Sequence, residues 1–208
     1  MAKLQVAIDL LSTEAALELA AKVAPYVDII ELGTPLIKQE GLKVVTAMKA
    51  AHPDKLVFAD MKTADTGSLE AEMAFNAGAD IVTVMGTVDD ATIKGAVEAG
   101  KKHGKKVVVD TIGVKNRVER AKQVVALGAD FVELHAGLDE QALPGYSVQT
   151  LVNEGKEAGV PFSVAGGVNI NTIKDVVAAG AVVAVAGGAI YGAADPAEAA
   201  KALKAALN

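Results

Sequence analysis

The chain of 208 residues has no cysteine, no tryptophan and only 3% aromatic residues. Without cysteine it can form neither disulfides nor thiolate metal sites, and this absence is compatible with a reducing compartment. Because large rings are scarce, alanine, valine and isoleucine must fill most of the core. Such packing is typical of short β-branched strands beneath alanine-rich helices.

An excess of positive charge and long apolar runs are also missing. The net charge is −6 with the two signs interspersed, which argues against nucleic acid or an anionic membrane surface as the main partner. The first apolar run ends at Asp9 and Leu11 without signal-peptide anatomy, and no run approaches the ~20 apolar residues of a membrane-spanning helix. We therefore expect a cytoplasmic protein that holds any phosphorylated substrate through local groups.

The apolar pattern alternates between strand and helix along the whole chain. Each apolar run is followed by an amphipathic segment rich in Ala, Glu and Lys, and the runs cover 4–9, 27–31, 56–61, 79–85, 106–111, 129–135, 160–165 and 181–186. Eight such pairs predict a closed (β/α)8 TIM barrel that occupies 1–208 as a single domain. A doubly wound sheet would alternate in the same way. However, no Gly-x-Gly-x-x-Gly follows the first run, which disfavours that fold with a nicotinamide or flavin cofactor.

Helix signals agree with this alternation. Ser12 and Asp195 precede amphipathic segments as N-caps, and Pro196 takes the first helical position. Glycines stand where helices should end before the next strand, at Gly78, Gly104, Gly128, Gly159 and Gly180.

Five of the apolar runs stop on charged or titratable residues, which are Asp9, Glu31, Asp60 with Lys62, Asp110 and His135. In a barrel of parallel strands these tips meet at one end, and that end carries the active site of this fold. The sequence therefore predicts an enzyme with its active site at the five tips.

Asp60 and Lys62 are two residues apart, so a regular strand would point both into the barrel mouth. An ammonium between carboxylates stays charged. Glu31 on the neighbouring strand would lie close to Asp60, and two oxygen ligands with open positions suit Mg²⁺. The alternative is a purely structural ion pair between Asp60 and Lys62, but five titratable tips at one end favour a catalytic role.

A single histidine at a strand end is more often structural than catalytic. His135, however, would share the mouth with Lys62 and several carboxylates, which can tune an imidazole for proton transfer. We expect His135 to be catalytic. Glu133 could also face inward, but we assign it to a deep salt bridge.

The last two strands end in paired glycines, Gly166-Gly167 and Gly187-Gly188. Glycines after the seventh and eighth strands let backbone N–H groups approach a phosphate. Two ordinary turns are the alternative, but the repetition at both strand ends favours a phosphate site.

These motifs together resemble the orotidine monophosphate decarboxylase superfamily over the whole chain. The resemblance rests on the Asp9 strand, 30–35, the Asp-x-Lys-x-x-Asp motif of Asp60, Lys62 and Asp65, and both Gly-Gly turns. Within the superfamily, 58–63, 133–141 and 185–192 are most similar to the 3-hexulose-6-phosphate synthase family.

The resemblance implies a reversible aldol reaction that joins formaldehyde to ribulose 5-phosphate, giving D-arabino-3-hexulose 6-phosphate in the ribulose monophosphate pathway. It further implies Mg²⁺, for which Mn²⁺ could substitute, and a homodimer in which Asp65 reaches the partner's active site. We assign the base to His135, and to Lys62 we assign stabilisation of oxyanion charge and the shuttling of protons. Asp9 and Asp110 orient the lysine, metal shell or substrate hydroxyls.

Other functions remain open at this stage. A related 3-keto-L-gulonate 6-phosphate decarboxylase shares the enediolate intermediate, but its pattern carries Arg, Arg and Glu where this chain has Leu138, Gly188 and Asp110. A phosphosugar isomerase or epimerase would use the same phosphate turns. A phosphosugar-binding module without activity has no need for Lys62 among carboxylates.

Overall fold

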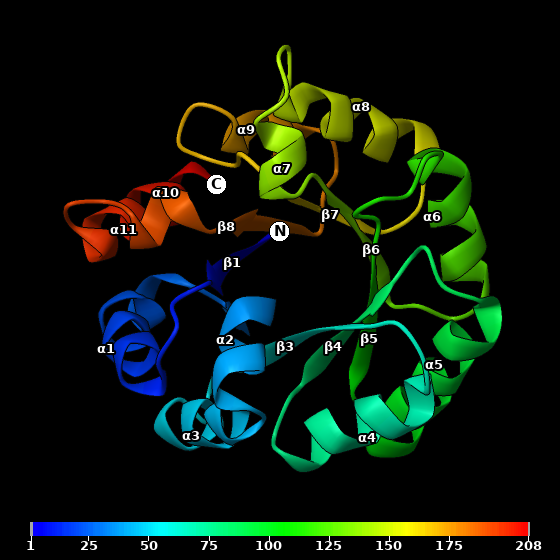
Figure 1. Ribbon diagram of the computed structural model, residues 1–208. Helices are drawn as coiled ribbons and strands as arrows, with labels where there is room; N and C mark the ends of the chain where they lie inside the picture. Colours follow the sequence, from blue (N-terminus) through cyan, green and yellow to red (C-terminus); the bar gives the residue numbers. More distant parts are fainter. Residues whose placement is uncertain (1, 208) are drawn as a thin grey trace.

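Eight parallel strands close into a barrel with helices around it (Figure 1). This computed structural model describes residues 2–207, so Met1 and Asn208 at the ends of the expected 1–208 domain lie outside the described residues. The strands are β1 (Lys3–Ile8), β2 (Ile29–Leu32), β3 (Leu56–Thr63), β4 (Ile81–Met85), β5 (Lys106–Asp110), β6 (Phe131–His135), β7 (Phe162–Ala165) and β8 (Val183–Ala186). They follow one another in chain order and β8 pairs with β1, so the predicted single-domain (β/α)8 barrel is confirmed.

Helices connect the strands on the outside of the barrel. They are α1 (Thr13–Val23), the 3-10 helix η1 (Ala24–Tyr26), α2 (Thr34–Glu40), α3 (Lys43–Ala51), α4 (Gly67–Asn76), α5 (Asp90–His103), α6 (Arg117–Ala126), α7 (Leu138–Gln141), α8 (Val148–Ala158), α9 (Ile173–Ala178), α10 (Gly188–Tyr191) and α11 (Pro196–Ala206). Within residues 2–207, no helix combines the length and apolar character needed to cross a membrane.

The helix boundaries predicted from N-cap residues and from C-terminal glycines are confirmed. The Ser12 side chain accepts the N–H of Ala15, and Asp195 accepts two N–H groups at the start of α11. Gly104 and Gly159 end α5 and α8 in the left-handed conformation, with φ of 63° and 65°. These local signals therefore set where the barrel strands can begin.

Several strands begin two residues later than predicted, because an aspartate occupies the turn before them. Asp28, Asp80 and Asp130 precede β2, β4 and β6 and accept the N–H groups of Leu4, Val57 and Val107 on the preceding strands. The side chain thus takes the place of a backbone partner at the lower edge of the barrel.

The barrel interior changes from apolar to polar along its axis. Its lower part is an apolar cluster that includes Ile29, Phe58, Ile81, Val108, Phe131 and Val183. Two residues further along the strands stand the buried polar side chains of Glu31, Asp60, Thr83, Asp110 and Glu133. Since residues two apart share a face of a strand, the pleat stacks this polar layer directly on the apolar one.

Strand β3 departs from regular geometry where its functional residues lie. Ala59 pairs with Val82 and Thr63 with Val84, so the three residues between them on β3 face a single residue, Thr83, on β4. Within this bulge Lys62 adopts a positive φ of 44°. A lysine held in that conformation is strained, by about 1–3 kcal/mol, and such strain is concentrated at functional sites.

Candidate active site

A cavity of about 1080 Å³ opens at the carboxyl ends of the strands. The predicted residues that line it are Asp9, Glu31, Asp60, Lys62, His135, Gly166, Gly167, Gly187 and Gly188. A cavity of this size encloses a small phosphorylated metabolite with room for a second reactant. Asp110 lies beneath this surface and is fully buried, whereas Asp65 lies outside the cavity.

Lys62 bridges two buried carboxylates. Its ammonium lies 2.7 Å from Asp60 Oδ2 and 2.8 Å from Asp110 Oδ2. Burial alone would lower the pKa of Lys62, but Asp60 and Asp110 outweigh it and raise that pKa well above its ordinary value. The lysine is therefore a fixed positive charge at the cavity floor and is unsuited to accept a proton.

Asp60 and Lys62 both line the cavity, as predicted, but the strand that carries them is not regular. The β3 bulge brings the two side chains together. The Asp60 carboxylate is surrounded by donors: Lys62 contacts both oxygens, Thr83 donates to Oδ1 and Thr34 donates to Oδ2. These three donors make four contacts, which take up the acceptor capacity of one carboxylate, so binding a metal requires Lys62 to give up a contact.

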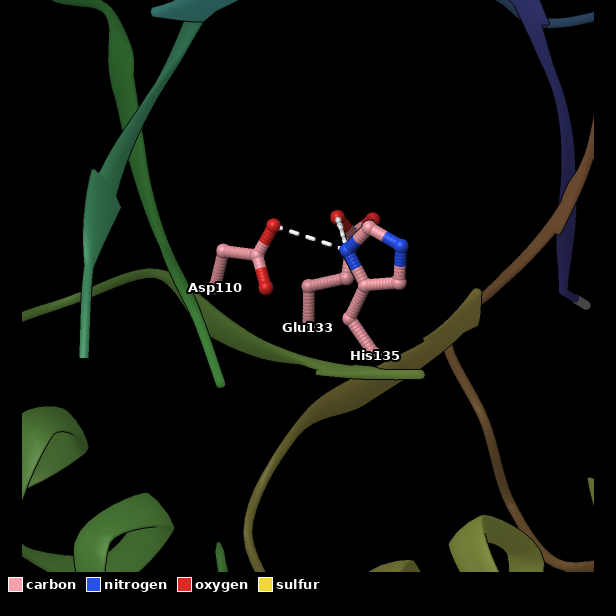
Figure 2. A group of neighbouring side chains, drawn as sticks. All are labelled: Asp110, Glu133 and His135. Carbon is pink, nitrogen blue, oxygen red and sulfur yellow. Dashed lines mark hydrogen bonds and ion pairs between the residues drawn. The ribbon is translucent and has the colours of Figure 1, made fainter. Parts of the chain in front are cut away.

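His135 stands beside Asp110 and Glu133 at the end of β6 (Figure 2). Its Nδ1 lies 2.8 Å from Asp110 Oδ2, while the other ring nitrogen points away from both carboxylates. Burial lowers the pKa of His135, but the Asp110 carboxylate more than offsets this and the pKa is raised. Asp110 thus holds the ring through Nδ1 and leaves Nε2 for a reactant.

Glu133 belongs to the site, although the sequence predicted a deep salt bridge for it. Its Oε2 is 3.9 Å from His135 Nδ1, a distant contact, and its Oε1 accepts from Ser163 Oγ at 3.4 Å. Burial, reinforced by Asp110, raises the pKa of Glu133 to about 7. The spacing of two residues from His135 on one strand was the signal that could have placed it in the cavity.

Glu31 is a buried carboxylate that would be stabilised in its ionised form by a nearby cation. It accepts one hydrogen bond, from Gln5 Nε2 at 2.7 Å. Burial, followed by repulsion from Glu133 and Asp60, raises its pKa well above the ordinary value. Five carboxylates gather around one lysine and one histidine, so the donor set and the excess negative charge suit a divalent cation.

Two sets of donors could hold that cation. Asp110, Glu133 and His135 offer ligand atoms within 4.8 Å of one another. The Lys62 ammonium contacts both sets, at 2.8 Å from Asp110 Oδ2 and 2.7 Å from Asp60 Oδ2, so its charge does not choose between them. In the predicted pair of Glu31 and Asp60, one Glu31 oxygen accepts from no hydrogen-bond donor among residues 2–207. Magnesium at these two residues stays a prediction.

The paired glycines present free N–H groups to the cavity. Gly166 and Gly167 have φ of 109° and 83°, and their carbonyls accept from Tyr146 at 2.6 Å and Asn169 at 3.0 Å. Among residues 2–207, the N–H groups of Gly167 and Gly187 donate to no other backbone group. Bound carbonyls and free N–H groups make these turns suitable for an anion.

Asp9 and Asp65 differ in their placement. The Asp9 carboxylate lies against Gly33, where an added Cβ would come within 2.1 Å of Asp9 Oδ1. Asp65 instead lies just before α4, where its Oδ1 accepts the N–H of Thr66. A single chain therefore does not bring Asp65 to the site, and its expected role toward a partner subunit stays a prediction.

Several residues that the fold brings to the site were not predicted from the sequence. Thr34, Gln141, Asn169 and Tyr191 line the cavity from α2, α7, the β7 turn and α10. Only Thr34 carried a signal, since it directly follows the second strand. The others lie on turns and short helices, where apolar periodicity conveys nothing about direction.

The site can now be compared with known proteins. A curated 3-hexulose-6-phosphate synthase from Mycobacterium gastri is 69% identical over 99% of each chain. A crystal structure of 3-hexulose-6-phosphate synthase superposes with a TM-score of 0.98 at 69% identity, covering 99% of this chain and 100% of the other. A 3-keto-L-gulonate-6-phosphate decarboxylase from Vibrio cholerae shares the fold with a TM-score of 0.88 at 30% identity, over 99% and 97% of the two chains.

The sequence profile of the orotidine 5'-phosphate decarboxylase / HUMPS family matches residues 2–203. This agrees with the resemblance seen in the motifs, and the identity is much higher to the synthases than to the decarboxylase. The chain therefore belongs to the orotidine 5'-phosphate decarboxylase / HUMPS family.

Proposed function

We propose that the protein is an aldolase that joins formaldehyde to ribulose 5-phosphate, giving D-arabino-3-hexulose 6-phosphate. The observation that carries this proposal is the array at the cavity floor, in which Asp110 holds both Lys62 and His135 at 2.8 Å. A fixed positive charge beside an oriented imidazole is the pair that removal of a proton next to a carbonyl requires. The similarity to named synthases extends over the full length of the chain.

The ketose phosphate would lie across the mouth. The free N–H groups at Gly167 and Gly187 bind its phosphate on the β7 and β8 side. This orientation directs the C1 to C3 end toward Lys62 and His135, on the β3 and β6 side. Binding energy at the distant phosphate thus positions the reacting carbons.

A magnesium or manganese ion held by Glu31 and Asp60 would act as a Lewis acid toward the ketose oxygens. The chain's own groups perform the proton transfer. His135 Nε2 removes a proton from C1, and the Lys62 ammonium stabilises the negative charge that develops on the substrate oxygens. Asp110 keeps the protonated ring in place through Nδ1.

The C1 to C2 electron pair of the enediolate then forms a bond to the carbon of formaldehyde. The formaldehyde oxygen becomes a hydroxyl by taking the proton from His135, so the imidazole returns to its neutral form. No electrons are gained or lost overall. The same residues serve both directions of the reaction.

Leu138 distinguishes aldol addition from decarboxylation. It lines the cavity at the start of α7, and its side chain is 76% exposed. An apolar side chain there supplies no proton donor over C1, whereas a decarboxylase must protonate that carbon. Keeping donors away leaves the enediolate free to meet formaldehyde.

We also propose a cytoplasmic homodimer with shared active sites. Asp65 and Leu69 line one shallow pocket, and Leu69 and Met73 on α4 are 60% and 48% exposed. Exposed apolar residues around an acidic side chain suit a subunit interface. Mixing Asp65→Ala with Lys62→Ala subunits should restore partial activity, and verified heterodimers without recovery would refute the shared site.

Formaldehyde consumption in the presence of ribulose 5-phosphate tests the proposed reaction. The wild type should show a much higher kcat/KM for formaldehyde addition than for decarboxylation of 3-keto-L-gulonate 6-phosphate. Leu138→Arg should shift the balance toward decarboxylation, and Leu143→Arg, which changes an exposed leucine outside the cavity, is the matched control. A wild-type preference for decarboxylation would overturn the proposal.

A further inference from the structure

Thr83 is the one β4 residue opposite the three residues of the β3 bulge. Its side chain is fully buried and does not line the cavity. The bulge removes the backbone partner that the Lys62 N–H would have in a regular ladder. Thr83 Oγ1 accepts this N–H at 2.9 Å instead.

The same hydroxyl also acts on Asp60. It donates to Asp60 Oδ1 at 2.8 Å, so one oxygen atom joins the Lys62 backbone to the Asp60 carboxylate. The Lys62 ammonium closes the ring by contacting both Asp60 oxygens. The strained φ of 44° at Lys62 is thus held by a contact that only a hydroxyl can make.

Thr111 repeats the arrangement on the other side of the site. It follows β5, is fully buried, and its Oγ1 accepts the N–H of His135 at 3.1 Å. It donates to the carbonyl of Glu133 at 2.9 Å. Each threonine therefore binds residue n of the neighbouring strand as a donor and residue n+2 as an acceptor.

We infer that Thr83 and Thr111 are positioning residues for the proposed proton transfer, each setting the backbone that carries Lys62 or His135. The inference rests on the proposed function of those two residues. Neither hydroxyl reaches the cavity, so neither touches substrate. Loss of either should displace the ammonium or the imidazole by a fraction of an ångström while the phosphate turns keep their place.

Thr83→Val and Thr83→Ser form the decisive pair. Valine keeps the shape of the side chain but loses the hydroxyl, whereas serine keeps the hydroxyl. Misplacement on this scale should lower kcat by about 10 to 100-fold in Thr83→Val, with KM for ribulose 5-phosphate within about threefold of wild type. Thr83→Ser should recover most of kcat. Thr46→Val, which removes a hydroxyl that donates to the carbonyl of Ala77 away from the cavity, should match wild type.

Exchange of the C1 proton of ribulose 5-phosphate with D₂O, measured without formaldehyde, separates this inference from the proposed reaction. Slower exchange in Thr83→Val and Thr111→Val, with calorimetric binding of ribulose 5-phosphate unchanged, supports positioning even if formaldehyde is not the co-substrate. Unchanged exchange in folded variants, or a loss that serine does not restore, overturns it. If Thr83→Val does not fold, the Thr111→Val and Thr111→Ser pair decides by the same criteria.

Discussion

The two halves of the barrel mouth present different chemical groups. On the β3, β5 and β6 side, buried side chains act through short ionic contacts, as between Lys62, Asp110 and His135. On the β7 and β8 side, the turns offer backbone N–H groups in place of charged side chains. These turns contain Gly166, Gly167, Gly187 and Gly188. Under the proposed function, catalysis would depend on side chains in the first half and substrate affinity on backbone conformation in the second, so substitutions should separate the two.

The largest effect is expected for His135→Ala. Loss of the base should lower kcat by about 10² to 10⁴-fold and abolish exchange of the C1 proton. Binding of ribulose 5-phosphate, measured by calorimetry, should stay within about threefold because the glycine turns are unchanged. His52→Ala, at the end of α3 and outside the cavity, is the matched control. Retained C1 exchange would refute the assignment of the base.

Removal of the metal should come next. Chelator should abolish activity, and Mg²⁺ or Mn²⁺ should restore it, because the carboxylates around Glu31 outnumber the cationic groups near them. Asp60→Asn should lose about 100-fold or more in kcat/KM without rescue at ordinary metal concentrations. The exposed Asp54→Asn should behave as wild type. Full activity in chelator would exclude the metal from the mechanism.

A smaller effect, on KM and not on kcat, is expected for the glycine turns on the β7 and β8 side. Gly167 and Gly145 both have φ of 83°, so alanine strains both backbones equally. Of the two, Gly167 lines the cavity, and its N–H, which donates to no backbone group of residues 2–207, would bind the phosphate. Gly167→Ala should raise KM by about 10-fold with little change in kcat, and Gly145→Ala should change neither. Equal KM values for the two variants would remove the phosphate role from this turn.

The smallest effect concerns stability and Glu133. Its pKa of about 7 in the folded protein exceeds the ordinary 4.5, so ionisation costs folding free energy as pH rises from 4.5 to 7. Glu133→Gln should remove this loss, which is on the order of 1–3 kcal/mol. Urea unfolding at pH 5 and pH 8 in chelator measures it. Glu18→Gln, at an exposed position, should leave the difference in unfolding free energy between pH 5 and pH 8 as in the wild type. The same result for Glu133→Gln would contradict the raised pKa of Glu133.

The hydrophobic periodicity and the local capping residues predicted much of this structure. The eight strands, the caps at Ser12 and Asp195, and the gathering of Asp9, Glu31, Asp60, Lys62 and His135 at one end all follow from residue spacing. Such features depend on neighbours in the chain or on the pleat, and these repeat regularly.

The β3 bulge lay outside that reasoning. A period of two places Lys62 above Asp60, but it does not foresee an unpaired N–H at Lys62 or the hydroxyl of Thr83 that accepts it. The predicted deep salt bridge of Glu133 is present but long, since its Oε2 lies 3.9 Å from His135 Nδ1. The sequence could not show that His135 lies closer to Asp110, at 2.8 Å, because that distance depends on packing across the barrel.

By itself, then, the sequence determined the alternation of strand and helix, the charged tips of five strands and the glycine turns after the last two. Tertiary structure alone decided which charges meet. Asp110 lies 48 residues from Lys62 and 25 residues from His135 along the chain, and the curved sheet from β3 to β6 brings each of them to 2.8 Å from Asp110 Oδ2. The physical reason is that local preferences depend on adjacent residues, whereas ionic contacts and the burial that shifts their pKa values depend on strands that become neighbours only in the folded barrel.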